Sequence, residues 1–300
     1  MKIKTFGSLN NRLWAIINLC VKKIVFINKV TPVGYIKRTF YCLLIIFGGN
    51  LAQAEQYIIG AQNIEYFPHY DFTSKVDKGV GWAILEAFSD ASGHEFVYLD
   101  MPVRRLQIEL NKGNVDFVYP DNPRWNSADT TAFEKTYSKP ITHTLSGTLV
   151  RSEDIGKGIN FIKKLAIPQG FTPVKWQSRI DDNLLSLVPI EETYNALSLL
   201  QHKEVDAVDV EYHVGKYFMQ SYPQLGPFSV DITLPFIDVP FLLSTLRHPE
   251  IIKELNVFLI NNQSLISNIY EKYDIALPEE LVERFRTEQN IEKDEVWKPL

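Results

Sequence analysis

The chain has 300 residues, of which 45% are hydrophobic and 12% aromatic, so it can bury the core of one large domain or two ordinary ones. Its formal charge of −5 is divided unevenly, because residues 1–54 hold eight Lys or Arg and no Asp or Glu, which leaves −13 for residues 55–300. An acidic body of this kind argues against nucleic acid or an anionic membrane surface as a partner.

The basic N-terminal segment has the pattern of a targeting signal. A Lys-Arg pair at 37–38 precedes the apolar run 40–47, and small residues follow it up to Ala54. The run is shorter than the roughly 20 residues that a membrane span needs. We expect residues 1–54 to be an N-terminal extension plus a signal peptide that is cleaved between Ala54 and Glu55, which makes the protein periplasmic. An uncleaved N-terminal anchor is the alternative.

Residues and motifs that are typical of catalysis or metal binding are scarce in the mature chain. Cys20 and Cys42 both precede the predicted cleavage site, which excludes a disulfide, a thiolate metal site and a cysteine nucleophile. The six histidines lack metal-ligand spacing, and no G-x-S-x-G, P-loop or G-x-G-x-x-G motif occurs. We therefore expect no catalytic residue, metal or cofactor, and a protein that is not an enzyme.

From residue 56 the pattern alternates between strand and helix. We expect a strand at 56–61, a helix at 82–91, a strand at 96–99, a helix from 102 to 112 with Leu106, Ile108 and Leu110 inward, and a strand at 115–119. Such alternation predicts a largely parallel sheet of the α/β class.

The pattern recurs further along the chain. Residues 110–118 and 200–208 each contain a helix end, a polar turn, a Val-Asp pair and a buried strand, although chance similarity is the alternative. This repeat predicts two α/β lobes built on one plan, in which Asp206 is structural, as Asp116 is. We place lobe 1 at 55–149 and 236–300, and lobe 2 at 150–235.

Later elements complete these lobes. Lobe 2 is expected to hold a strand at 165–167 and a helix around 214–219, and a strand near 236–243 returns to lobe 1. Helices at 249–260 and 265–273 are expected to pack on lobe 1, whereas the charged tail from Pro278 is expected to be exposed.

In this order the residues resemble the extracellular solute-binding proteins of type II topology, the amino-acid-binding group called family 3. The resemblance covers about residues 56–275 and rests on six short stretches: Tyr66-Phe67-Pro68, Gly81, Gly113-Asn114-Val115-Asp116, Tyr137-Ser138-Lys139-Pro140, Ile167-Pro168-Gln169-Gly170 and Val205-Asp206-Ala207-Val208. It implies a two-lobed α/β fold in which each lobe is a mostly parallel sheet flanked by helices.

The same resemblance implies a function and partners. A monomer would capture a small charged or polar ligand in the cleft between its lobes, an amino acid or a related small acid or amine, and pass it to an ABC permease. A sensor that docks on a membrane receptor is one alternative, and a periplasmic dehydratase or lyase on the same fold is another. The threonine-proline-x-arginine motif of the amino-acid binders is replaced here by residues 121–125.

Charged residues near strand and helix ends are candidates for holding that ligand. The planar fork of Arg124 suits a carboxylate, with Asp121 and Asn122 beside it, although a surface arginine is the alternative. Arg105 lies near a helix start, where a bound anion would offset its charge. Glu211, or else Asp209, would pair with a ligand ammonium.

Other candidates would form the walls and the second anion-binding loop. Gly170 and Thr172 resemble the loop that binds an anionic group in lobe 2, with a plain helix cap as the alternative for Thr172. Aromatic walls are expected from Tyr66, Tyr70 and Trp82, unless these rings belong to the core, and Trp125 is expected either to form the floor of the pocket or to cover its own loop.

Overall fold

The computed structural model describes residues 55–125 and 134–297, which form one compact unit. No helix in these two ranges is long and apolar enough to cross a membrane. The predicted signal peptide, with Ala54 at its cleavage site, lies outside the described residues.

Lobe 1 begins with the alternation that the sequence predicts. Its first elements are β1 (Gln56–Gln62), α3 (Val80–Ser92), β2 (Glu95–Met101), α4 (Val103–Lys112), β3 (Phe117–Asp121) and β4 (Thr136–Tyr137). Strand β1 pairs in parallel with both β2 and β3. Leu106 and Leu110 of α4 are buried as predicted, but the inward placement of Ile108 is wrong, because it is 51% exposed. Residues four apart share a helix face, and a residue midway between them lies on the opposite one.

Lobe 2 repeats the plan with a second parallel set of strands. Short 3-10 turns at Ser152–Asp154 and Ile159–Phe161 precede β6 (Lys164–Pro168), and another at Val174–Trp176 precedes α5 (Gln177–Asp181). The remaining elements are β7 (Ser186–Ile190), α6 (Thr193–Gln201), β8 (Ala207–Glu211), α7 (Tyr212–Ser221) and β9 (Phe228–Val230). Strand β6 pairs in parallel with β7 and with β8.

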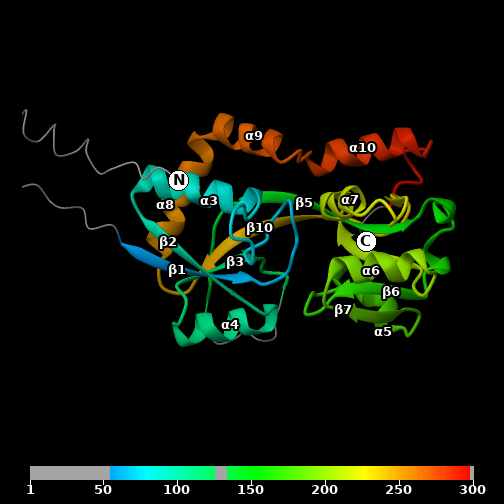
Figure 1. The fold of residues 1–300 in the computed structure, drawn as a ribbon, viewed down its shortest axis with the longest axis horizontal. Coiled ribbons are helices and arrows are strands. Elements are labelled where there is room, and N and C mark those ends of the chain that lie inside the picture. Colours follow the sequence, from blue (N-terminus) through cyan, green and yellow to red (C-terminus); the bar gives the residue numbers. More distant parts are fainter. Residues whose placement is uncertain (1–54, 126–133, 298–300) are drawn as a thin grey trace, which may run out of the picture. The chain divides into compact units, whose positions relative to one another are not determined.

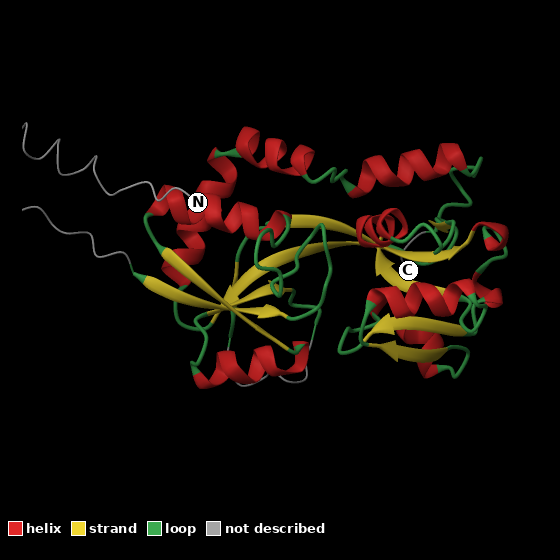
Figure 2. Ribbon diagram, viewed as in Figure 1, coloured by secondary structure: helices red, strands yellow, loops and turns green. Residues whose placement is uncertain are grey.

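Two antiparallel strands, β5 (Thr142–Arg151) and β10 (Ile237–Thr245), connect the lobes. At one end β10 pairs with β3 and β4, and at the other end β5 pairs with β8 and β9. The strands therefore follow the single order β2-β1-β3-β10-β5-β8-β6-β7. Figure 1 shows β5 and β10 running from one lobe into the other, and Figure 2 shows the helices beside the strands.

The two Val-Asp turns use the same hydrogen bonds, which confirms the structural role of Asp206. The Asp116 carboxylate accepts the backbone N–H of Ile58 on β1 at 2.8 Å. The Asp206 carboxylate likewise accepts the N–H groups of Lys163 and Lys164, at the start of β6, at 2.8 Å each. In each lobe a turn aspartate thus anchors the neighbouring parallel strand.

The C-terminal helices are α8 (Pro249–Asn261), α9 (Gln263–Lys272) and α10 (Pro278–Glu288). Helices α8 and α9 pack against α3 of lobe 1, as predicted. The prediction of an exposed tail is wrong for α10, because Leu281 and Phe285 are buried. These two residues are four apart and so form a short apolar stripe in a charged segment. The ring of Phe285 packs edge-on against Tyr212 of α7, with centroids 4.9 Å apart, so α10 lies on lobe 2.

Candidate functional site

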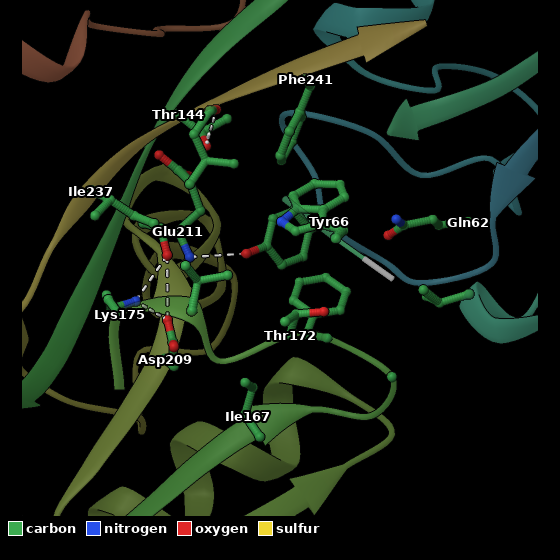
Figure 3. A pocket seen from close by; sticks show the side chains of 17 residues that line it. Gln62, Tyr66, Thr144, Ile167, Thr172, Lys175, Asp209, Glu211, Ile237 and Phe241 are labelled. Atoms are coloured by element: carbon green, nitrogen blue, oxygen red, sulfur yellow. Dashed lines mark hydrogen bonds and ion pairs between the residues drawn. The ribbon is translucent and has the colours of Figure 1, made fainter. Parts of the chain in front are cut away.

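A pocket lies where the carboxyl ends of β1, β6 and β8 meet, the edge at which open α/β sheets place their ligands. The space that its lining residues surround is about 670 Å³, and this value includes the solvent at its mouth. Figure 3 shows the side chains around it, which come from both lobes. The lining residues are Gln62, Tyr66, Val103, Trp125, Thr144, Ser146, Ile167, Gly170, Phe171, Thr172, Val174, Lys175, Asp209, Glu211, Ile237, Val239 and Phe241.

Five of the residues that the sequence nominates line this pocket. They are Tyr66, Trp125, Gly170, Thr172 and Glu211. Asp209, named as the alternative to Glu211, lines it too. The first two come from lobe 1 and the others from lobe 2, so the pocket brings together side chains that are far apart in the sequence.

The two nominated arginines lie outside the pocket lining. The exposed Arg124 donates from Nη2 to the backbone oxygen of Asp238 at 3.2 Å. The side chain of Arg105 is 64% exposed, and its Nε lies 3.3 Å from Glu109 Oε1. In this conformation neither guanidinium faces the pocket.

The other nominated residues outside the lining serve the surrounding structure. Asp121 is the last residue of β3, which pairs there with β10. Its buried carboxylate forms an ion pair with Lys135 at 2.7 Å. Asn122 donates to the backbone oxygen of Pro240 at 2.9 Å. Tyr70 stacks on Tyr66, with centroids 5.2 Å apart. Trp82 packs against the hydrophobic core.

Lys175 is a pocket residue that the sequence argument missed. Its side chain is only 2% exposed, and its ammonium forms an ion pair with Asp209 and donates to Ser146 Oγ at 2.9 Å. Burial lowers the pKa of Lys175, and the neighbouring Asp209 opposes that change. Lysine side chains are seldom buried unless they are paired, and nothing in the sequence around residue 175 indicates such a pairing.

Glu211 is a carboxylate buried where β8 passes into α7, of which it is the N-cap. Its Oε2 accepts the backbone N–H of Val214 at 3.0 Å and lies 2.9 Å from His69 Nε2, and its Oε1 lies 2.9 Å from His213 Nδ1. Because Ala276 N–H donates to His213 Nε2 at 3.0 Å, the proton of that ring is on Nδ1 and faces Glu211. Burial raises the pKa of Glu211, but the two histidines outweigh it and hold the pKa well below its usual range.

His69, Glu211 and His213 also form the one group, within 55–125 and 134–297, whose ligand atoms are close enough to hold a metal ion. Two imidazoles and a carboxylate are ligands that zinc accepts. A metal on this group would have to displace the Nδ1 proton of His213, which already bonds to Glu211. We therefore assign His213 a hydrogen bond to Glu211 and His69 a close contact with the same carboxylate at 2.9 Å, which brings the loop after β1 against lobe 2.

Tyr66 makes a second link between the lobes. Its hydroxyl oxygen accepts the backbone N–H of Glu211 at 3.0 Å, and its ring packs on Phe171 with centroids 5.5 Å apart. Burial and the nearby Glu211 carboxylate raise the pKa of Tyr66 well above its usual value, so the hydroxyl keeps its proton. The Tyr66 O–H can therefore donate a hydrogen bond to a ligand.

Gly170 marks a close approach of the lobes. Its φ of +89° is a left-handed conformation that glycine adopts without strain. A Cβ atom at this position would lie 3.3 Å from Val103 Cβ, on α4 of lobe 1. The loop after β6 can reach lobe 1 this closely because residue 170 has no side chain.

No protein-family model matches the chain, and no curated protein matches it either. Solved structures do match. The ligand-binding core of GluR0 in complex with L-glutamate is 15% identical, with a TM-score of 0.59, over 74% of this chain and 99% of that chain. An arginine third transport system periplasmic binding protein from Legionella pneumophila is 17% identical, with a TM-score of 0.58, over 73% and 99%.

A third structure of this kind is the ancestral amino-acid-binding protein AncCDT-1, a precursor of cyclohexadienyl dehydratase. It is 16% identical, with a TM-score of 0.56, over 77% of this chain and 97% of that chain. These structural similarities span nearly the full length of each of the three proteins. At such low sequence identity, what they identify is the fold of this chain. The chain has the two-lobed α/β fold of the type II periplasmic binding proteins, as its resemblance to family 3 implies.

Proposed function

We propose that this chain is a periplasmic solute-binding protein that captures a small polar or charged ligand between its lobes and delivers it to an ABC permease. The observation that carries the proposal is the pocket itself, because polar side chains from both lobes converge on it. A ligand that contacts both lobes binds the closed state better than the open one, and so shifts the protein towards closure.

The architecture supports reversible closure about the paired strands β5 and β10. We propose lobe 1 as residues 55–149 with 236–277 and lobe 2 as 150–235. We add residues 278–297 to lobe 2 because α10 packs there. Residues 1–54 would be the segment removed on export.

A thermal-shift screen of residues 55–300 against amino acids, small acids, amines and short peptides tests the proposal. A ligand present at about 100 times its Kd stabilises the fold by about 2.7 kcal/mol, which raises the midpoint clearly. A screen in which no compound raises the midpoint, and in which calorimetry detects no binding, would contradict a solute-binding role.

Trp125 offers a second measurement on the same site, because it lines the pocket and its ring lies 5.8 Å from Phe241. We expect a ligand found in the screen to change the tryptophan fluorescence, and we expect Trp125→Phe to remove most of that change. Trp176, which is buried in a separate cluster of lobe 2, provides the matched control in Trp176→Phe. A fluorescence change that survives Trp125→Phe would place the ligand elsewhere.

Delivery to a permease is tested in cells of the source organism. Deleting the gene should abolish uptake of the radiolabelled ligand at concentrations near its Kd, and re-expression should restore it. Unchanged uptake, combined with loss of a transcriptional response to the ligand, would favour the sensor.

A further inference from the structure

The acidic groups of the pocket already have cationic or N–H partners from the protein. Asp209 is neutralised by the buried ammonium of Lys175. Glu211, which is 1% exposed, contacts the rings of His69 and His213 and the N–H of Val214 at the start of α7. A ligand ammonium would find neither carboxylate unpaired.

Lys175 itself occupies the place that an ammonium ligand would take. Its Nζ contacts one carboxylate, that of Asp209, and one hydroxyl, that of Ser146. An incoming amine would compete with Lys175 for the same two groups and would bring a second positive charge beside the first. Such like-charge contacts are costly in a desolvated site.

Hydrogen-bond donors, in contrast, remain available around the pocket. An ammonium group has three N–H donors, and Asp209 and Ser146 take two of those on Lys175. Tyr66 accepts from Glu211, and its own O–H has no acceptor among residues 55–125 and 134–297. The Thr172 hydroxyl likewise donates to no group in these two ranges.

Most of the other lining is apolar. Val103, Ile167, Val174, Ile237 and Val239 are aliphatic, and Trp125, Phe171 and Phe241 are aromatic. Such walls suit a ligand with an apolar body, and the donors suit one oxygen-bearing end. A carboxylate fits that end best, because it accepts several charge-assisted hydrogen bonds at once.

We infer that Lys175 sets the ligand class, and that the pocket takes a small carboxylate with an apolar body and no ammonium group. This inference rests on the proposed function, since it names the solute of the same site. It separates this chain from the ligand-binding core of GluR0, which shares its fold and is bound to L-glutamate.

Matched sets of three compounds test the inference by calorimetry on residues 55–300. Each set holds an amino acid, the acid that lacks its amino group and the amine that lacks its carboxyl group. One set is 3-phenylpropanoate, phenylalanine and 2-phenylethylamine, and another is 4-methylpentanoate, leucine and 3-methylbutylamine. We expect the acid to bind at least about tenfold more tightly than the amino acid of its set, and the amine not to bind. An amino acid or amine that binds as tightly as the acid overturns the inference and leaves the proposed function standing. Absence of binding by every compound, with a negative thermal screen, overturns both.

Substitution of Lys175 sharpens the test. Lys175→Met leaves Asp209 unneutralised, so we expect affinity for the acid to fall at least about tenfold and affinity for the amine to appear. The double variant Lys175→Met/Asp209→Asn removes both charges and provides a foldable alternative, which should lose the preference for the acid without gaining amines. Unchanged preference in the double variant overturns the role of Lys175.

The buried pair Lys135–Asp121 supplies the matched control. Its N···O distance is 2.7 Å and its lysine side chain is 4% exposed, but neither residue lines the pocket. Lys135→Met should therefore lower the unfolding midpoint and leave the ranking of acid, amino acid and amine unchanged. A changed ranking in this variant would show that any buried lysine alters specificity, which contradicts the inference.

Discussion

Glu211 shows how a single buried carboxylate is kept charged in this protein. An ion with 1% exposure is costly unless it is hydrogen-bonded, and here two imidazoles and one backbone N–H surround it. His69 comes from the loop after β1 in lobe 1, whereas His213 and the Val214 N–H belong to the first turn of α7 in lobe 2. Contact between the lobes therefore supplies one of the three groups that stabilise the charge.

The lowered pKa of Glu211 predicts a particular loss of stability in acid. A carboxyl group whose pKa is lower in the folded state than in the unfolded state stabilises the fold. The stabilisation is complete above the unfolded-state pKa, which is about 4.3 for Glu, and it is lost as the pH falls through the folded-state pKa. Between about pH 7 and pH 3, the unfolding free energy should therefore fall more steeply for the wild type than for Glu211→Gln. Urea titrations measure both slopes, and parallel slopes would contradict the assignment.

At the scale of elements, the loop after β6 depends on the lack of a side chain at Gly170. Gly170→Ala would add strain of about 1–2 kcal/mol at positive φ and would push the loop away from Val103. We expect ligand affinity to fall at least about tenfold, because closure is impeded. Affinity is measured by calorimetry and stability by urea unfolding.

Gly93→Ala is the control for that substitution. Gly93 has a φ of +80°, but a Cβ atom there would meet nothing within 4 Å. The two variants should therefore lose similar stability, whereas ligand affinity should fall in Gly170→Ala alone. Equal affinities in the two variants would show that the approach to Val103 is unimportant for binding.

Helix α10 should contribute strongly to stability despite its charged sequence. Phe285 is 2% exposed and packs against Tyr212, so Phe285→Ala should lower the unfolding free energy by about 3–5 kcal/mol. Val257, 57% exposed on α8, gives the control Val257→Ala, for which we expect a change within about 0.5 kcal/mol. Urea unfolding measures both variants, and similar values would mean that α10 is only loosely attached.

The strand and helix pattern could be predicted from sequence because periodicity and turn residues record which face of each element is buried. The pattern placed α3, α4 and the two Val-Asp turns correctly. It failed at Ile108 and at the apolar stripe of α10, where two buried residues are outnumbered by charges. Short stripes of this kind carry little periodic signal.

The pocket was harder to predict, because its lining depends on contacts between distant segments. Trp125 and Glu211 could be nominated because they follow strands, and both line the pocket. Lys175 could not be nominated, since its burial depends on Asp209 and Ser146 lying opposite it. Contacts between distant segments also explain why Arg124 does not line the pocket, because its guanidinium donates to the backbone of Asp238 on β10.

At the scale of the whole molecule, both lobes share one hydrophobic cluster. It includes Ile59 and Phe117 of lobe 1 as well as Val208 and Val214 of lobe 2. A core that is continuous across the lobes favours cooperative unfolding, although each lobe has its own parallel strands.

We therefore predict one unfolding transition for residues 55–300. The Trp176→Phe variant keeps Trp125 beside Phe241, and Trp125→Phe keeps Trp176 in the lobe 2 cluster, while Trp82 and Trp297 remain in both, so the fluorescence of the two variants gives the two regions different weights. Both midpoints in urea should coincide with the midpoint from far-ultraviolet circular dichroism. Two separated midpoints would mean that the lobes unfold independently.

The register of β5 against β10 has a consequence for how such a chain could be shortened. Ser146 and Ile237 are directly opposite each other on these antiparallel strands, although ninety residues of sequence separate them. A tight turn joining the two positions would excise the intervening segment as a single cassette, and would leave β1 to β4, β10 and helices α3, α4, α8 and α9 on one unbroken scaffold. Apart from α10, lobe 2 is therefore an insert carried within a single hairpin.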